Sequence, residues 1–397
     1  MIPALPKRRI ELMNLEDPIK MHRDLRGKIV ISSKIELNEE TLPIAYTPGV
    51  AKASDAIAKD KSQVNVLTGR QNTVPVVSDG SAVLGLGNVG PEAAMPVMEG
   101  KAAIFAQFAG INAVPICLDT QDTEEIIKIV KALAPSFGGI NLEDISAPRC
   151  FEIEQRLTEA LDIPVFHDDQ HGTAIVVLAG LINALKVAGK DKNVKIVISG
   201  AGAAGIAIAN LLFHYGFENL CLCDSEGIVS HERKNLSEHK KSIVGRSASP
   251  CKKGTCNLAL KGADVLIGVS KPGQFTARDI EAMNENPIVF AMANPIPEIM
   301  PDEARKGGAK VIATGRSDFP NQINNALVFP GLFRGLLDNG IQKVTMDIKV
   351  AVSEAIAKMV ENPTAEKIIP SIFEKSLVPT IANSMQDFDK IGKIKVK

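Results

Sequence analysis

The sequence predicts an α/β fold, with an N-terminal α/β domain, a doubly wound domain after it and a helical segment at the C-terminus. Short apolar runs alternate with longer segments of helical period along most of the chain. A glycine-rich turn near residue 200 joins one such run to a helix, and the period after residue 331 is helical. The 397 residues are enough for two or three domains.

Strand and helix already alternate in the first part of the chain. The run 114–118 is typical of a buried strand, and apolar residues recur at helical spacing over 123–133. An Ala- and Leu-rich segment, 173–185, predicts a long helix that crosses into the second unit. We therefore expect the first domain to span residues 1–165.

The second unit has the clearer doubly wound pattern, with a helix expected over 204–215. Strands are predicted at 194–199, 220–223, 263–269, 287–292 and 311–314. These elements give a second domain over residues 166–330. Residues 331–397 lack a strand pattern, so we expect them to pack back on the other domains as helices.

Composition and charge favour small ligands over macromolecular partners. Lys plus Arg (45) nearly cancels Asp plus Glu (46), so no global field attracts nucleic acid or an anionic membrane. The basic tract 233–253 has no interleaved aromatic residue, which favours a solvated helix and loop over a nucleic-acid patch. No long apolar run lies near the amino terminus, so we expect no membrane span and a cytoplasmic protein.

The six cysteines are scattered along the chain without C-x-x-C spacing. That pattern is not typical of a secreted disulfide framework or of a structural zinc site. We therefore expect neither, and a reducing compartment.

Gly200, Gly202 and Gly205 form a Gly-x-Gly-x-x-Gly pattern between a predicted strand and an uninterrupted helix. Asp224 ends the next strand, 24 residues after Gly200. Such a turn lets the backbone approach a pyrophosphate at a helix N-terminus, while the acid accepts from ribose hydroxyls. A plain strand-to-helix turn is the alternative. We predict a Rossmann-type dinucleotide site, which consists of Gly200, Gly202, Ala203, Ala204, Gly205 and Asp224.

A second match to the same pattern occurs earlier, at Gly85, Gly87 and Gly90. Pro91 and Pro96 follow it, so we expect a less regular helix there, and no acidic strand end stands at the required distance. We expect a glycine-rich turn that brings backbone close to a substrate, rather than a second nucleotide site.

Three carboxylates, Glu143, Asp144 and Asp169, stand where short apolar strands meet loops. Hard oxygen ligands suit Mg²⁺ or Mn²⁺, and surface or helix-capping acids are the alternative. Adjacent side chains in a helix diverge by about 100°. Glu143 and Asp144 can therefore share an ion only if the backbone there is extended or turning. The nearby glycines 138 and 139 favour such a backbone.

A zinc site at His167 and His171 is disfavoured. The preceding Pro-Val-Phe is strand-like, and a third ligand is missing.

Lys101 and Tyr46 are candidate proton-transfer groups. Lys101 is embedded in apolar residues, and burial can bring a lysine pKa toward neutrality, although such a side chain often extends its ammonium to water. Tyr46 lies in a loop bounded by Pro and Gly, where its phenol could donate a proton or cap a core.

Together these segments resemble the malic enzyme family. YTPGVA, GLGNVG, EGKAA, NLEDI, FHDDQHGTA, SGAGAAG, AMANP and INNALVFPG occur in that family's order from residue 46 to 331. The resemblance implies the following roles: Tyr46 as proton donor, Lys101 as general base with Asp168 as its partner, Glu143, Asp144 and Asp169 as metal ligands, and Asn294 and Asn325 as substrate-binding asparagines, with Asn294 also at the cofactor.

The resemblance also implies an activity, a cofactor and a partner. It implies oxidation of L-malate by NAD or NADP with a bound Mg²⁺ or Mn²⁺, loss of CO₂, and protonation of the resulting enolate to pyruvate. It implies a catalytic first domain that binds malate and metal, and a homodimer or higher homo-oligomer. In its short length and in the form of its FHDDQHGTA motif, the chain resembles the bacterial and archaeal members of the family.

The chain departs from longer members of that family at the first glycine turn. They place an arginine where this chain has Ser81, Ala82 and Val83, so the group for the second malate carboxylate is open. Asp224 and Glu226 favour NAD, with NADP as the alternative.

Other activities fit the same residues. A malolactic or oxaloacetate-decarboxylating reaction would use the same site. A metal-independent two-domain dehydrogenase would need Lys101 but no metal ligands. A nucleotide-sensing protein would need neither Lys101 nor the metal ligands.

Overall fold

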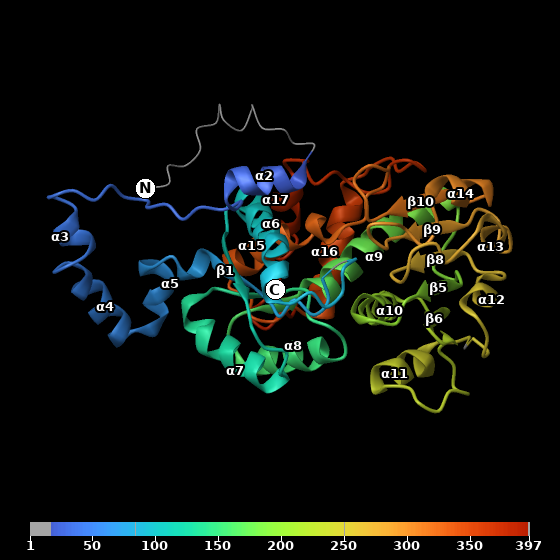
Figure 1. Cartoon of the computed structure of the whole chain (residues 1–397), viewed down its shortest axis with the longest axis horizontal. Helices are drawn as coiled ribbons and strands as arrows, with labels where there is room; N and C mark the ends of the chain where they lie inside the picture. Colours follow the sequence, from blue (N-terminus) through green and yellow to red (C-terminus); the bar gives the residue numbers. More distant parts are fainter. Residues whose placement is uncertain (1–16, 84, 250, 396–397) are drawn as a thin grey trace.

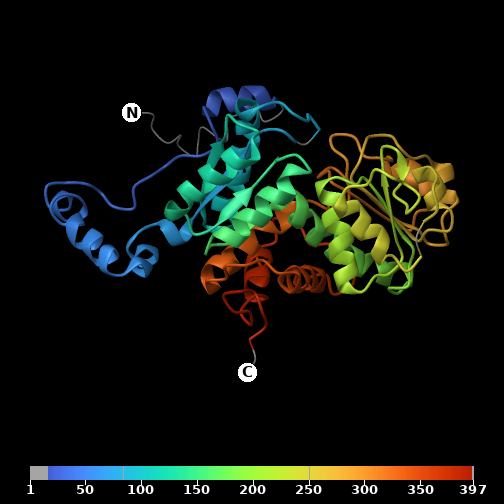
Figure 2. The same ribbon diagram turned by 90° about the horizontal axis from the view of Figure 1, so that it is seen from below.

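The computed structural model describes residues 17–83, 85–249 and 251–395, which form two α/β units and a helical C-terminal segment (Figures 1 and 2). The first unit has a four-stranded parallel sheet in the order β2-β1-β3-β4. Its strands are β1 (Thr73–Ser78), β2 (Asn112–Cys117), β3 (Ile140–Leu142) and β4 (Val165–His167). The predicted α/β fold class is confirmed.

Helices cover both faces of this first sheet. They are α6 (Pro91–Ala109), α7 (Thr123–Leu133) and α8 (Arg149–Ala160). Val76 faces α6 and Val77 faces α7 and α8, as the alternation of a strand requires. The helix predicted over 123–133 is confirmed, and Asp122 caps it by accepting from the Glu125 N–H at 2.9 Å.

The second unit has a six-stranded sheet in the order β10-β9-β8-β5-β6-β7, parallel except for β7. Its strands are β5 (Ile196–Ser199), β6 (Leu220–Asp224), β7 (Gly227–Ile228), β8 (Val265–Gly268), β9 (Ile288–Ala291) and β10 (Val311–Thr314). Its helices are α10 (Ala203–Tyr215), α11 (Glu238–Arg246), α12 (Cys256–Leu260), α13 (Ala277–Glu281) and α14 (Pro301–Lys306). All five predicted strands are confirmed to within a few residues.

Helix α9 (Asp168–Ala188) links the two units and lies in the core. It is long and apolar enough to span a membrane by composition, but 72% of its most apolar window is buried inside the protein. Burial of nearly every side chain all around a helix is typical of the central helix of a folded domain.

The C-terminal segment packs against the helices of both units. It carries α15 (Phe329–Asn339), α16 (Met346–Lys358) and α17 (Leu377–Asn383). Helix α15 contacts α6, and α16 contacts α9 and α10.

An arm precedes the first sheet and projects from the body of the chain (Figures 1 and 2). Its helices are α3 (Leu42–Ala45), α4 (Val50–Lys59) and α5 (Val64–Leu67), and α2 (Pro18–Leu25) precedes them next to α6. The arm has no buried residue in α3, α4 or α5, and Ile44 is 76% exposed.

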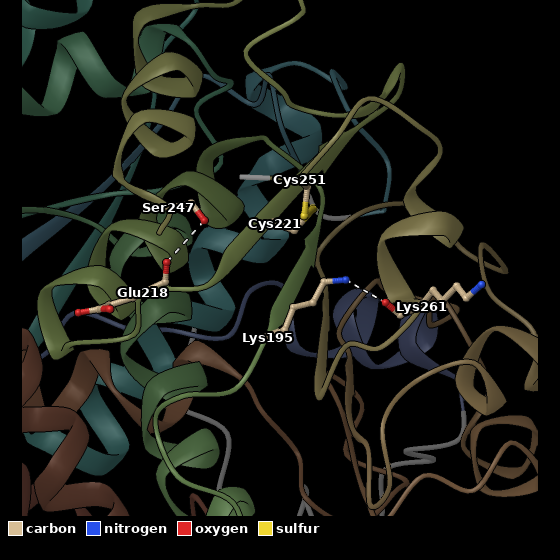
Figure 3. Close-up of a disulfide and its surroundings, with 6 residues drawn as sticks. All are labelled: Lys195, Glu218, Cys221, Ser247, Cys251 and Lys261. Carbon is tan, nitrogen blue, oxygen red and sulfur yellow. Dashed lines mark hydrogen bonds between the residues drawn. A yellow bond between two sulfur atoms is a disulfide. The ribbon is translucent and has the colours of Figure 1, made fainter. Parts of the chain in front are cut away.

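Two expectations from the sequence are wrong. The helix after the first glycine turn is regular, because Pro91 takes the first position, where the N–H is unpaired anyway, and α6 continues through Pro96. Cys221 of β6 and Cys251 are joined by a disulfide that links this strand to the segment after α11 (Figure 3). Partners 30 residues apart give no local spacing signal.

Candidate active site

Four acidic residues meet where β3 and β4 end. Leu142 and His167 are the last residues of the two strands and pair directly. Because the strands are parallel, the residues that follow them share one edge of the sheet. Glu143 and Asp144 follow β3, and Asp168 and Asp169 begin α9.

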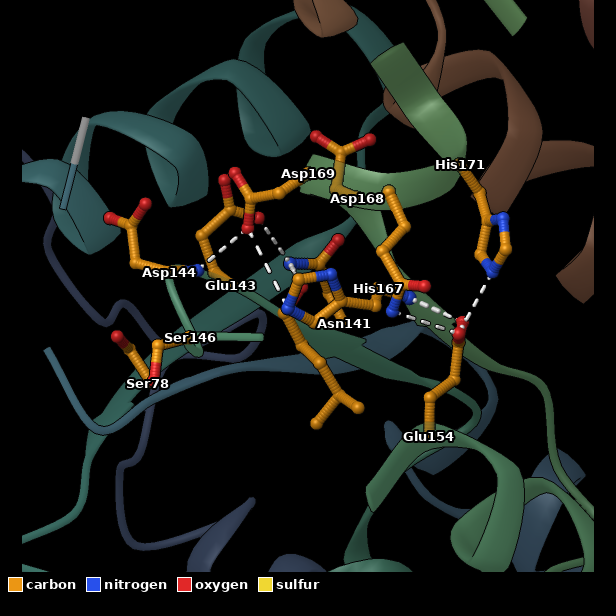
Figure 4. A network of polar contacts seen from close by, with 12 residues as sticks. Ser78, Asn141, Glu143, Asp144, Ser146, Glu154, His167, Asp168, Asp169 and His171 are labelled. Carbon is orange, nitrogen blue, oxygen red and sulfur yellow. Dashed lines mark hydrogen bonds and ion pairs between the residues drawn. The ribbon is translucent and has the colours of Figure 1, made fainter. Parts of the chain in front are cut away.

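Three of these carboxylates surround one point (Figure 4). Ligand oxygens of Glu143, Asp144 and Asp169 lie within 4.8 Å of one another, and the first two are buried. The backbone turns at Asp144, whose φ of 53° is in the left-handed region, so adjacent side chains can converge. The Asp144 N–H donates to Asp169 Oδ2 at 2.7 Å and fixes this turn. The turn thus lies at Asp144 itself rather than at the glycine pair 138–139.

Lys101 reaches this cluster from α6. Its Nζ donates to Glu143 Oε1 and to Asp168 Oδ2, and it lies 4.5 Å from the centre of the Phe329 ring. The residue is only 7% exposed, so its ammonium stays inside instead of extending to water. Asn141 Nδ2 donates to the other Glu143 oxygen at 3.0 Å.

The ionisation of these groups is strongly coupled. Burial lowers the pKa of Lys101, but Asp168 and Glu143 outweigh burial and raise that pKa above its usual range. Burial and then the Asp169 charge raise the pKa of Asp144 to about 8 and that of Glu143 well above normal. Burial raises the pKa of Asp168 to about 6 despite Lys101. If all four acids were ionised, the cluster would carry more negative charge than one ammonium can balance.

The donor set fits a divalent cation. Oδ2 of Asp144 is buried without a hydrogen-bond partner, next to two further carboxylates. A hard cation would pair with that oxygen and offset the crowding of like charges, and carboxylate oxygens are the ligands that Mg²⁺ and Mn²⁺ prefer.

Gly172 lets Asp168 turn back along α9 toward Lys101. A Cβ on Gly172 would lie 1.8 Å from Asp168 Oδ1 and 2.8 Å from its Cγ. Side chains of a helix point toward its N-terminus, so residue 172 faces residue 168. Only glycine leaves room for this carboxylate.

A cavity of about 500 Å³ lies between the acid cluster and the second sheet. Asp144 and Asp169 line one side, and Asn294 and Asn325 line another. Gly85 of the first glycine turn also lines the cavity, where its Cβ would lie 2.8 Å from the Asn294 carbonyl oxygen.

The second glycine turn opens on the same cavity. Gly202, Ala203 and Ala204 line it at the N-terminus of α10. A Cβ on Gly205 would lie 1.8 Å from the Gly200 carbonyl oxygen, so glycine is required where helix and strand pack closely. Nothing lies within 4 Å of a Cβ on Gly202, which leaves open space for a ligand. The turn fits a dinucleotide pyrophosphate.

Asp224 lines an adjoining cavity of about 590 Å³, which shares Gly202 with the first. Its carboxylate is held by Arg233 Nη1 at 2.7 Å and Lys240 Nζ at 2.6 Å. Arg233 also pairs with Glu226 at 3.1 Å. Burial raises the pKa of Asp224, but these cations outweigh it and the net pKa is lowered.

Tyr46, the expected proton donor, lies away from the acid cluster. It ends α3 on the projecting arm and is 66% exposed (Figures 1 and 2). Within one described chain, Tyr46 does not meet Lys101.

The structure adds residues that the sequence patterns did not indicate. Arg149 donates to Asp79 and to the Ser81 and Ser146 hydroxyls, next to the first glycine turn. Glu298 accepts from the Ala293 N–H at 3.0 Å and so holds the loop that carries Asn294. Asp79 and Ser81 are 70 and 68 residues away from Arg149 in the sequence, so no local signal marks this arginine.

Comparison with known proteins gives matches over most of the chain. Residues 26–158 match the family described as the malic enzyme N-terminal domain, and residues 170–383 match the malic enzyme NAD binding domain. The chain is 51% identical over 390 residues to the NAD-dependent malic enzyme of Geobacillus stearothermophilus, which covers 97% of this chain and 81% of that protein. It is 49% identical over 375 residues to the bifunctional malic/malolactic enzyme of Bacillus subtilis. That match covers 93% of this chain and 92% of the Bacillus protein.

Solved structures agree in fold. The NAD-dependent malic enzyme of Thermotoga maritima has a TM-score of 0.90 at 47% identity, over 93% of this chain and 99% of that one. The malic enzyme of Pyrococcus horikoshii has a TM-score of 0.88 at 47% identity, and the match covers 94% of this chain and 89% of that one. The chain therefore belongs to the malic enzyme family.

Proposed function

We propose that the chain oxidises L-malate with NAD and releases pyruvate and CO₂, in a reaction that requires Mg²⁺ or Mn²⁺. The observation that carries this proposal is the position of Lys101, buried between Asp168 and Glu143 at the point where a three-carboxylate cluster meets a cavity lined by a dinucleotide turn. The names of the Geobacillus and Bacillus relatives support it.

Each residue of the site has a separate task in this proposal. Glu143, Asp144 and Asp169 hold the metal, which when bound supplies positive charge that polarises the substrate oxygens and offsets the acids that keep Lys101 protonated. Lys101 takes the hydroxyl proton, and Asp168 orients its ammonium.

Asn294 and Asn325 would donate amide hydrogen bonds to a malate carboxylate from the far side of the cavity. Asn294 also lies next to the cofactor turn. In the described residues that line the cavity there is no cationic side chain, which leaves the second carboxylate to neutral donors or to another chain.

We propose that Tyr46 acts in the site of a second copy, within a homodimer or larger assembly. The arm that carries it exposes apolar side chains, among them Ile44 (76%) and Val66 (77%), which a partner surface would cover. The separation of Tyr46 from Lys101 within one chain supports this arrangement.

Mixing inactive variants tests the proposed sharing of sites. Tyr46→Phe and Lys101→Ala homodimers, unfolded together and refolded, form mixed dimers in which one site has both native residues. We expect activity to return on mixing. No recovery in confirmed mixed dimers would place both residues in the same subunit.

We propose NAD as the preferred cofactor, with NADP as the alternative. Asp224 accepts from ribose hydroxyls and opposes a 2′-phosphate. Arg233 and Lys240 compensate part of that charge, so NADP should be used more weakly rather than rejected.

The remaining assignments concern organisation and location. We propose a malate- and metal-binding domain over 1–165, an NAD(P)-binding domain over 166–330, a C-terminal helical segment over 331–397, and a cytoplasmic location. The two separate sheets, with strands within 73–167 and 196–314, support the first division.

Product analysis tests the activity. L-malate and Mn²⁺ with NAD or NADP in turn should yield equal amounts of reduced cofactor and pyruvate. Lactate without net NADH would instead indicate a malolactic reaction, which the Bacillus relative's name makes the second candidate. Turnover that survives thorough chelation with EDTA would contradict the metal requirement.

A further inference from the structure

Glu154 of α8 is the centre of a second, part-buried polar cluster, which lies across His167 from the acidic one (Figure 4). Its side chain is 13% exposed and joins three elements of the fold. One oxygen accepts from the backbone N–H of His167 at 2.8 Å. The other accepts from His171 Nε2 at 2.8 Å and from Gln170 Nε2 at 3.2 Å.

These contacts all lie at the start of α9, whose N-cap residue is His167. His167 is the residue before Asp168 and Asp169, while Gln170 and His171 are the two residues after them. Glu154 therefore binds the backbone N–H just before the two carboxylates and the side chains of the two residues just after them, without touching either carboxylate. The N–H groups at the start of a helix have no partner within the helix and carry partial positive charge. An ionised carboxylate can accept a hydrogen bond from them and stabilise that charge.

Lys349 completes the cluster from the C-terminal segment. It lies on α16, is 6% exposed, and its Nζ donates to His171 Nδ1 at 2.9 Å. A lysine donor at Nδ1 leaves Nε2 as the protonated nitrogen that donates to Glu154. Lys349, His171 and Glu154 form a continuous chain of hydrogen bonds that ends on the backbone N–H of His167, the residue before Asp168.

The charges favour an ionised Glu154. Burial raises its pKa, but His171 and Lys349 outweigh burial and lower the pKa to about 2. Burial lowers the pKa of Lys349 to about 8, which still leaves it largely protonated at neutral pH. A charged acceptor bonded to backbone N–H is stronger and more directional than a neutral one.

We propose that Glu154, held by His171 and Lys349, is a positioning residue that sets the first turn of α9 and with it the carboxylates of Asp168 and Asp169. Through Lys349 the C-terminal segment takes part in ordering the metal site. The inference rests on the metal-dependent activity proposed above and adds the residues that hold its ligands in place.

Glu154→Gln tests this role, since it keeps size but removes the charge and places an amide where an acceptor is needed. Loss of a group that orients metal ligands typically weakens metal binding by about 10- to 100-fold. We expect that rise in the Kd for Mn²⁺, measured by electron paramagnetic resonance on the protein without substrate. The Kd for NAD should stay within about twofold, because the cofactor turn is on another sheet.

Asp264→Asn is the matched control. Asp264 has the same 13% exposure, accepts from the Lys195 backbone N–H at 2.8 Å and pairs with Lys190 at 2.7 Å. It precedes β8, at the edge of the second sheet opposite the cofactor turn. Both variants should lower Tm, whereas only Glu154→Gln should weaken Mn²⁺ binding.

A folded Glu154→Gln protein with wild-type Mn²⁺ affinity would overturn the inference. If that variant does not fold, Lys349→Met removes the far end of the chain and should raise the Mn²⁺ Kd in the same direction; no change there would overturn the inference equally. A wild-type protein that binds Mn²⁺ but does not oxidise malate would instead contradict the proposed function.

Discussion

Gly172→Ala should disable the site by adding one methyl group. The new Cβ would lie 1.8 Å from Asp168 Oδ1, and real contacts of this kind do not fall below 3.0 Å, so the oxygen must move by about 1.2 Å. Asp168 Cγ at 2.8 Å and Asn325 Cβ at 3.1 Å restrict the direction of that movement. Asp168 must then adopt another rotamer and leave Lys101.

Two free-energy terms oppose each other in this variant. Alanine stabilises a helix interior by about 1 kcal/mol relative to glycine. Breaking a buried ion pair costs about 3–5 kcal/mol, and Lys101 keeps Glu143, so the lower end applies. We expect a net loss of about 2 kcal/mol in the unfolding free energy, and a fall of about 100-fold in kcat from the misplaced carboxylate.

Urea denaturation and steady-state kinetics measure the two effects. Gly245→Ala in α11 is the control, since its Cβ would meet nothing within 4 Å. It should stabilise the protein by up to about 1 kcal/mol and leave kcat unchanged. Wild-type kcat in Gly172→Ala would refute the role given to the contact between Asp168 and Lys101.

Three further predictions follow from the same geometry. Lys101→Ala should abolish malate turnover while NAD binding, measured by calorimetry, stays near normal; near-normal rates would remove Lys101 from proton transfer. Asp224→Ser should raise the KM for NAD and lower that for NADP, because Arg233 and Lys240 become free for a 2′-phosphate; an unchanged KM ratio would contradict this. The folded pKa of Glu154, about 2, lies below its ordinary 4.5, so its stabilisation is present above pH 4.5 and lost as pH falls toward 2. Urea titrations from pH 4.5 to 3 should therefore show a steeper loss of stability in wild type than in Glu154→Gln, and equal slopes would refute the shift.

Strong local patterns predicted the second unit well. The strand, glycine turn and helix at 196–215 have their signals within a few residues of one another, and the structure confirms them. The acids after β3 and β4 were predictable as candidates, because each follows a short apolar run. Their convergence depends on the pairing of Leu142 with His167, which no local pattern shows.

Features that join distant segments were not predictable. No local pattern marks Glu154, because its partners His171 and Lys349 are 17 and 195 residues away. Tyr46 fitted the family's motif, but a motif carries no information on which subunit's site it serves. The sequence also could not decide the pKa of Lys101, since burial and the acids oppose each other and only their distances settle the balance.

The central claim is that one divalent ion is shared by Glu143, Asp144 and Asp169 beside the bound cofactor. Anomalous diffraction at the manganese edge, from crystals grown with Mn²⁺ and NAD, tests it most directly. We expect a single strong peak within about 2.1 Å of an oxygen of each carboxylate. Manganese bound elsewhere, with these three side chains left without an ion, would contradict the account.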